Sequence, residues 1–134
     1  MADTQGKPRS DRFDRGLETR RSVLGDAYVD TSLAAADDFT WPMQVFATEV
    51  CWDHVWNRPG LDRRSRSLLN LGMISALNRP HELKLHIRGA LNNEITKAEL
   101  AEVFLQVAAY CGTPAGLDSF RIAREVFAEM GLNG

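Results

Sequence analysis

A single histidine stands among leucines in the segment PHELKLHIRGALNNE, residues 80–94, with a glutamate four positions before it. Four residues make about one helical turn, so Glu82 and His86 share a face if this segment is a helix. His86 also falls on the flank of the apolar stripe that begins at Leu83. An imidazole in that position is desolvated on one side, and a neighbouring carboxylate holds its tautomer or stabilises its charge. The pair is a candidate acid–base device, with an ordinary half-buried histidine as the open alternative.

Three arginines follow a helix-start signal in NRPGLDRRSR, residues 57–66. Asp62 is a suitable N-cap, so Arg63, Arg64 and Arg66 fall in the first turn, where the helix macrodipole disfavours cations. One explanation is an anion held by the guanidinium groups and the free backbone N–H groups. The other is that the arginines are exposed or pair with acidic residues of another subunit. Arg66 lies nearest the apolar run that follows.

Two tryptophans share a helical face in ATEVCWDHVW, residues 47–56. Trp52 and Trp56 form an aromatic wall with carboxylates beside it, which is typical of a small-molecule cleft. It is also typical of a subunit interface, where tryptophan is favoured, and for the two tryptophans the interface is the preferred interpretation. Glu49 lies on a stripe that is expected to face inward, which makes it a second candidate catalytic carboxylate.

The composition indicates one soluble globular domain. The chain has 134 residues, 44% of them hydrophobic and 25% charged, with a net charge of −2. This balance gives no reason to expect nucleic acid or an anionic membrane as a partner. The polar start of the chain has no apolar segment typical of a secretory signal, and no run is long enough to span a bilayer. Two cysteines sixty positions apart form no disulfide framework, so we expect a reduced, cytoplasmic setting.

Signals for helix starts and ends then assign the candidate residues to predicted helices. The pattern predicts helices over residues 13–24, from about 38 to 55, from 62 to 77, from 80 onward, from 96 to 111 and from 113 to 130. A looser segment is expected at 26–37. TKAE at residues 96–99 reads as a capping box, and the segment LLNLGMISAL is apolar nearly all round, as in a helix buried at the centre of a bundle. We therefore expect an all-α fold of six to seven helices, with a flexible tail at residues 1–12 and a single domain at 13–134.

Several of these motifs, in this order, resemble the carboxymuconolactone decarboxylase family of the alkylhydroperoxidase-like (AhpD-like) superfamily. They are GLETRRSVLGDAYVD, WNRPGLDRRSRSL and the long segment from Arg66 to Val126, so the similarity runs from about Phe13 to Met130. The resemblance implies an AhpD-like helical bundle that assembles as a homo-oligomer, a trimer or hexamer.

Peroxidase members of that superfamily carry a Cys-x-x-Cys ahead of a histidine and a relay glutamate one helix earlier. Placing that histidine on His86 puts Arg79 and Glu82 at the cysteine positions and Ser67 at the relay glutamate. The resemblance therefore disfavours a thiol peroxidase, which is kept as an alternative. A non-catalytic oligomer that binds small carboxylates is the other alternative.

The family resemblance implies decarboxylation of 4-carboxymuconolactone to the 3-oxoadipate enol-lactone, a step in protocatechuate degradation. The electron pair left by CO2 runs through the ring double bond into the lactone carbonyl, so no cofactor and no metal are expected. Catalytic roles fall to His86, Glu49 and Glu82, and substrate binding falls to Arg63, Arg64, Arg66 and Trp52. His86 is expected to act as general acid or to hydrogen-bond the developing oxyanion, and the arginines to grip a carboxylate.

Overall fold

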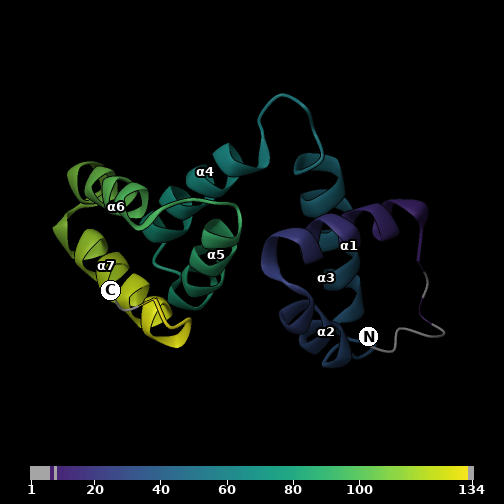
Figure 1. Ribbon diagram of the computed structural model, residues 1–134. Helices are drawn as coiled ribbons and strands as arrows, with labels where there is room; N and C mark the ends of the chain where they lie inside the picture. Colours follow the sequence, from purple (N-terminus) through teal and green to yellow (C-terminus); the bar gives the residue numbers. More distant parts are fainter. Residues whose placement is uncertain (1–6, 8, 133–134) are drawn as a thin grey trace. The chain divides into compact units, whose positions relative to one another are not determined.

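The computed structural model describes Lys7 and residues 9–132 (Figure 1). Most of the tail expected at residues 1–12 lies outside that range, and the first helix already begins at Asp11, with Ser10 as its N-cap. The described residues are helical or irregular and contain no strand, which confirms the all-α prediction.

Contacts within the chain divide it into two compact units, Met1–Leu61 and Asp62–Gly134. The first unit holds α1 (Asp11–Leu24), α2 (Asp26–Ala34), α3 (Trp41–Phe46) and the π-helix η1 (Ala47–Val55). The second unit holds α4 (Arg63–Ala76), α5 (Pro80–Asn92), α6 (Lys97–Cys111) and α7 (Thr113–Glu129). The NRPG segment between η1 and α4 contains the predicted helix break.

In the first unit, α1 packs directly on the backbone of η1. A Cβ placed on Gly16 would lie only 1.9 Å from the carbonyl oxygen of Thr48, so the two helices meet where α1 has no side chain. Phe13 and Trp41 pack ring to ring nearby, with centroids 5.4 Å apart. The contact between α1 and η1 therefore depends on a glycine at position 16.

Two sequence expectations for this unit were wrong. The looser segment expected at 26–37 contains a helix, α2, and the α-helix expected from 38 to 55 begins at Trp41 and widens into a π-helix at Ala47. The amide of Trp56 bonds the carbonyl of Cys51, five residues earlier, at 2.9 Å. In this wider turn, residues four positions apart lie on the same side of the helix. Thr48, Trp52 and Trp56 are buried along that side.

The next positions of the same helix form a polar ladder with α1. Three side-chain pairs make it up: Ser10 with Glu49 at 2.9 Å, Arg15 with Asp53 at 3.4 Å and Thr19 with Asn57 at 2.7 Å. Because the pairs advance in step along both segments, α1 and η1 run parallel.

Helices α4, α5, α6 and α7 make up the second unit (Figure 1). They pack around one apolar core. The predicted inward stripe of α5 is confirmed, since Leu83, Ile87 and Ala90 are buried. The rest of this core comprises Leu71, Ile95, Leu100, Phe104, Ile122, Ala123 and Val126. The expectation that α4 is buried all round was wrong, because Leu69 and Met73 are about half exposed.

Helix α6 begins with the predicted capping box. The Thr96 hydroxyl accepts from the Glu99 amide at 3.1 Å, and the Glu99 carboxylate accepts from the Thr96 amide at 3.1 Å. Thr96→Ala is expected to lower the free energy of unfolding by about 1 kcal/mol, because the Glu99 amide loses its acceptor and the Glu99 carboxylate loses the hydroxyl that donates to it. Urea denaturation measures the loss. Thr96→Ser keeps the acceptor and is the control; an equal loss in both variants would contradict the capping explanation.

Candidate functional site

The acid–base pair proposed from the sequence lies on one face of α5. Pro80 occupies the first turn, where its missing N–H costs nothing, and the helix then carries Glu82 and His86 one turn apart. His86 is half-buried, whereas Glu82 is exposed. Burial lowers the pKa of His86, and the Glu82 carboxylate opposes that shift. The imidazole is therefore largely neutral near pH 7 until a negative charge approaches it.

This shift carries a consequence for stability. Because the native pKa of His86 is lowered, the unfolded chain binds a proton here at a higher pH than the native protein does. The free energy of unfolding is therefore expected to fall as the pH drops through about 6.5. His86→Gln should lose this part of the dependence, measured by urea denaturation between about pH 7 and 5. His81→Gln, at an exposed histidine of α5, should retain it; parallel curves for all three proteins would contradict the assignment.

A hydrogen bond fixes how α4 and α5 lie beside each other. The Asn93 side-chain amide donates to the hydroxyl of buried Ser67 at 3.0 Å, which ties the start of α4 to the end of α5. Asn93 follows His86 by about two helical turns, or roughly 10 Å along the axis. Arg66 precedes Ser67 in the chain and belongs to the first turn of α4.

The three arginines of α4 have different surroundings. Asp62 caps the helix as predicted and accepts from the Ser65 amide at 2.7 Å. Arg64 forms an ion pair with Glu99 of α6, which also lowers the pKa of Glu99. Arg63 is exposed, whereas Arg66 is half-buried and its Nε atom is fully buried. Arg66 is thus the arginine whose charge is best placed to meet a ligand out of bulk water.

Glu49 and Trp52 belong to the first unit. Glu49 is half-buried and accepts a hydrogen bond from the Ser10 hydroxyl at 2.9 Å, so its carboxylate already takes part in the ladder with α1. Trp52 is buried and stacks on Trp56 at 4.8 Å between ring centroids. These contacts hold the first unit together, and the roles of Glu49 and Trp52 in the reaction stay predictions.

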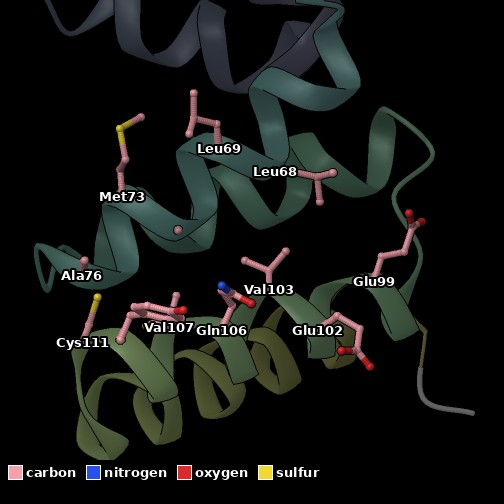
Figure 2. Close-up of a pocket in the computed structure, with 12 residues that line it drawn as sticks. Leu68, Leu69, Met73, Ala76, Glu99, Glu102, Val103, Gln106, Val107 and Cys111 are labelled. Atoms are coloured by element: carbon pink, nitrogen blue, oxygen red, sulfur yellow. The ribbon is translucent and has the colours of Figure 1, made fainter.

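The sequence did not point to the groove between α4 and α6, a cavity of about 650 Å³ (Figure 2). Leu68, Val103 and Val107 contribute to its apolar lining, and its charged lining residues are Glu99 and Glu102. Arg64 pairs with Glu99, but the Glu102 carboxylate repels a dianionic substrate and the residues that line the cavity supply no cation to hold it. This groove has the wrong sign for such a substrate.

A second cavity, about 690 Å³ between α6 and α7, has the opposite sign. Lys97, Arg121 and Arg124 surround a floor that includes Phe104 and Phe127. The charge of Arg121 is shared with Asp118 at 3.5 Å and Glu125 at 3.2 Å, and the Lys97 ammonium lies over the Phe127 ring. The lining has cations but neither an imidazole nor a carboxyl group, so it lacks the acid–base pair that α5 provides.

The cysteines give little support to thiol chemistry. Cys51 is half-buried in η1, and burial raises the pKa of its thiol, whereas a reactive cysteine needs a lowered pKa. Cys111 is exposed at the end of α6. Across the described residues no group of three or more His, Cys, Asp or Glu side chains is arranged to hold a metal ion. No helix in this part of the chain is both long and apolar enough to cross a membrane.

Comparison with known proteins shows which family the chain resembles. The model of the carboxymuconolactone decarboxylase family matches residues 43–125. A nitrosuccinic acid decarboxylase of Metarhizium robertsii is 45% identical over 118 residues, which cover 88% of this chain and 82% of that protein. A 4-carboxymuconolactone decarboxylase of Acinetobacter baylyi is 41% identical over 121 residues, which cover 90% of each chain.

The chain belongs to the carboxymuconolactone decarboxylase family. The match begins in α3 and ends in α7, so it includes η1 of the first unit and all of the α4–α5 pair. Both relatives are named as decarboxylases, but their names give different substrates.

Proposed function

We propose that this protein is a carboxy-lyase that converts 4-carboxymuconolactone to the 3-oxoadipate enol-lactone without a cofactor. The observation that carries the proposal is the 41% identity to a 4-carboxymuconolactone decarboxylase over 90% of both chains. The structure adds a half-buried imidazole with a carboxylate one turn away, on the helix that the sequence indicated.

The substrate provides its own electron sink. When the carbon–carboxyl bond breaks, its electron pair moves through the ring double bond and onto the lactone carbonyl oxygen. CO2 leaves, and a proton then adds to the α-carbon of the ring. The protein must hold the second carboxylate, stabilise the developing oxyanion and supply that proton.

His86 fits the last two tasks. Its N–H donates to the oxyanion while the imidazole is neutral. The dianionic substrate raises the pKa of His86, so the imidazole takes up a proton from solvent and then transfers it to the α-carbon. Glu82 acts in the same direction from the preceding turn. Arg66 holds a substrate carboxylate, and Arg63 lies in the same first turn of α4. Arg64, which is paired with Glu99, contributes less.

Nitrosuccinate is a second candidate substrate because the relative with 45% identity is named for that acid. The two acids share one arrangement: a carbon that carries the departing carboxylate, a CH2–carboxylate arm and an electron-accepting group. In nitrosuccinate the nitro group takes the electron pair as a nitronate. The same cation and proton donor therefore suit both reactions, and the volume needed for the lactone ring distinguishes them.

Direct assays of the purified protein with authentic 4-carboxymuconolactone and with nitrosuccinate decide between these candidates. Release of CO2 from the lactone, with the enol-lactone as product, supports the proposal. Release of CO2 from nitrosuccinate but not from the lactone identifies nitrosuccinate as the substrate. A binding isotherm without turnover of either acid identifies a carboxylate-binding oligomer. Peroxide reduction that disappears in the Cys51→Ser/Cys111→Ser double variant identifies the thiol peroxidase.

Arg66→Gln is expected to raise KM for the substrate roughly 10-fold or more, because a charge-assisted hydrogen bond to a carboxylate is lost. Steady-state kinetics measures the change. Arg124→Gln is the matched control, since it removes an exposed arginine of the α6–α7 cavity. A larger rise in KM for Arg124→Gln would move the substrate carboxylate to that cavity.

We also propose that the protein acts in the cytoplasm and assembles as a homo-oligomer. Two free cysteines suit a reducing compartment. The apolar groove between α4 and α6, with exposed Leu69 and Met73 at its edge, is a surface suited to a second copy. Sedimentation velocity measures the assembly, and a monomer at all concentrations would reject it.

A further inference from the structure

The first unit contains an arginine that is buried without an acidic partner. Arg20 of α1 is 6% exposed, yet its hydrogen bonds are to neutral side chains. Its neighbour Arg21 shows the usual arrangement, with Asp26 at 3.3 Å and Asp30 at 2.7 Å. Among the described residues, no carboxylate forms an ion pair with Arg20. Burying a guanidinium without a counter-charge is costly, so its surroundings need an explanation.

Four side chains from four different helices form a cage at this point. Arg20 Nη1 donates to Gln44 Oε1 at 2.8 Å and to Thr48 Oγ1 at 3.5 Å, and Nη2 donates to Ser32 Oγ at 3.1 Å. Gln44 Nε2 also donates to Ser32 Oγ at 3.1 Å. The cage therefore joins α1, α2, α3 and η1.

Counting donors and acceptors shows what the cage lacks. A guanidinium has five N–H donors, and three are used, with the buried Nε left without an acceptor. Ser32 Oγ accepts twice, which occupies both of its lone pairs and leaves its own O–H to donate. Gln44 retains a second amide N–H. The cage therefore has more hydrogen-bond donors than acceptors, and the donors surround a positive charge. A negatively charged group that accepts hydrogen bonds would satisfy them.

We propose that the Arg20 cage, formed by Arg20, Ser32, Gln44 and Thr48, binds the carboxylate of a small organic acid. Nε and Nη2 lie on the edge of the guanidinium that takes a carboxylate bidentately, and the Ser32 hydroxyl lies at the same Nη2. Ser32 and Gln44 are half-buried, so the acid reaches the cage from their side. The proposal is argued only from contacts within the first unit and does not depend on the identity of the decarboxylated substrate.

The test uses the full-length 15N-labelled protein and follows the arginine Nε–H signals by NMR during titration with succinate. The Arg20 signal is expected to move downfield and to saturate at millimolar succinate, because its buried N–H gains a charged acceptor. Succinamide, the neutral isostere, should leave the signal in place. No movement with succinate, or equal movement with sodium chloride, would overturn the proposal.

Two variants separate the cage from its surroundings. Arg20→Lys keeps the positive charge but removes the two parallel N–H donors of the guanidinium. Its affinity for succinate, measured by calorimetry, is expected to fall roughly 10-fold or more. Arg21→Lys, at the arginine already paired with two aspartates, should bind as the wild type does. Equal affinities in the wild type and Arg20→Lys would reject the assignment. Because the NMR titration needs only the wild type, a misfolded variant leaves the test intact.

A carboxylate from a second copy of the chain is the competing source of the same chemistry. In that case the Arg20 signal starts at the bound position without succinate and moves when the protein is diluted. Such a dilution-dependent signal would overturn the small-acid proposal. A signal that is independent of protein concentration and responds to succinate supports it.

Discussion

Replacement of His86 by alanine is expected to lower kcat for decarboxylation roughly 10²–10⁴-fold. The free energy of unfolding should change by only about 1 kcal/mol, because the imidazole is half-buried on the flank of α5 and the core positions Leu83 and Ile87 are untouched. Single-turnover kinetics and urea denaturation measure the two effects separately. The size of the first effect reflects the loss of both the oxyanion contact and the proton source.

His81→Ala is the control, since His81 is exposed at the start of the same helix. Glu82→Gln adds a readout that a purely structural role would not move. The Glu82 carboxylate raises the pKa of His86, so its removal should shift the alkaline limb of the kcat/KM profile, where the proton donor is lost, to lower pH. Near-normal turnover of His86→Ala would remove the imidazole from the mechanism.

Gly16→Ala is expected to destabilise the protein by about 2–4 kcal/mol. A Cβ at this position would meet the Thr48 carbonyl oxygen at 1.9 Å and the Asp53 amide nitrogen at 3.2 Å. Both are backbone atoms of the π-helix, so neither can rotate away, and α1 must move off η1. Thermal and urea denaturation measure the loss.

Gly72→Ala is the matched control in the middle of α4. No atom lies within 4 Å of a Cβ built there, so the substitution is expected to be neutral or stabilising by up to about 1 kcal/mol. Because each glycine lies inside a helix, propensity alone predicts a gain at both positions. A gain at Gly16 would contradict the close contact between α1 and η1.

Much of the fold was predictable because helix ends are coded locally. Asp62, Pro80 and Thr96 begin helices for reasons that involve only their own backbone neighbours, and each prediction was confirmed. The Glu82–His86 pair was predictable for the same reason, since residues four apart on a helix share a face. Its catalytic role rested on the family resemblance, because spacing alone does not distinguish a functional histidine from a structural one.

The widening of the chain at Ala47 was not predictable from spacing. The α-helical period aligns Phe46, Glu49 and Val50, whereas the π-helix buries Thr48 and Trp52. The π-helix packs against α1 at Gly16, thirty-two positions before Thr48, and no local sequence pattern reports such a long-range contact. The position of the Glu49 side chain follows from the π-helical turn, which directs its carboxylate toward the Ser10 hydroxyl.

The sequence alone determined where most helices begin and end, that the fold is all-α, and that one imidazole shares a helix face with a carboxylate. These properties depend on interactions within a few residues, which the order of side chains specifies directly. Only the tertiary structure decided which of the first-turn arginines forms an ion pair with Glu99. The same holds for the contact between α1 and the π-helix and for the burial of Arg20 among neutral side chains. Each of these depends on which distant segments pack together, and that is set by the burial of whole helix faces.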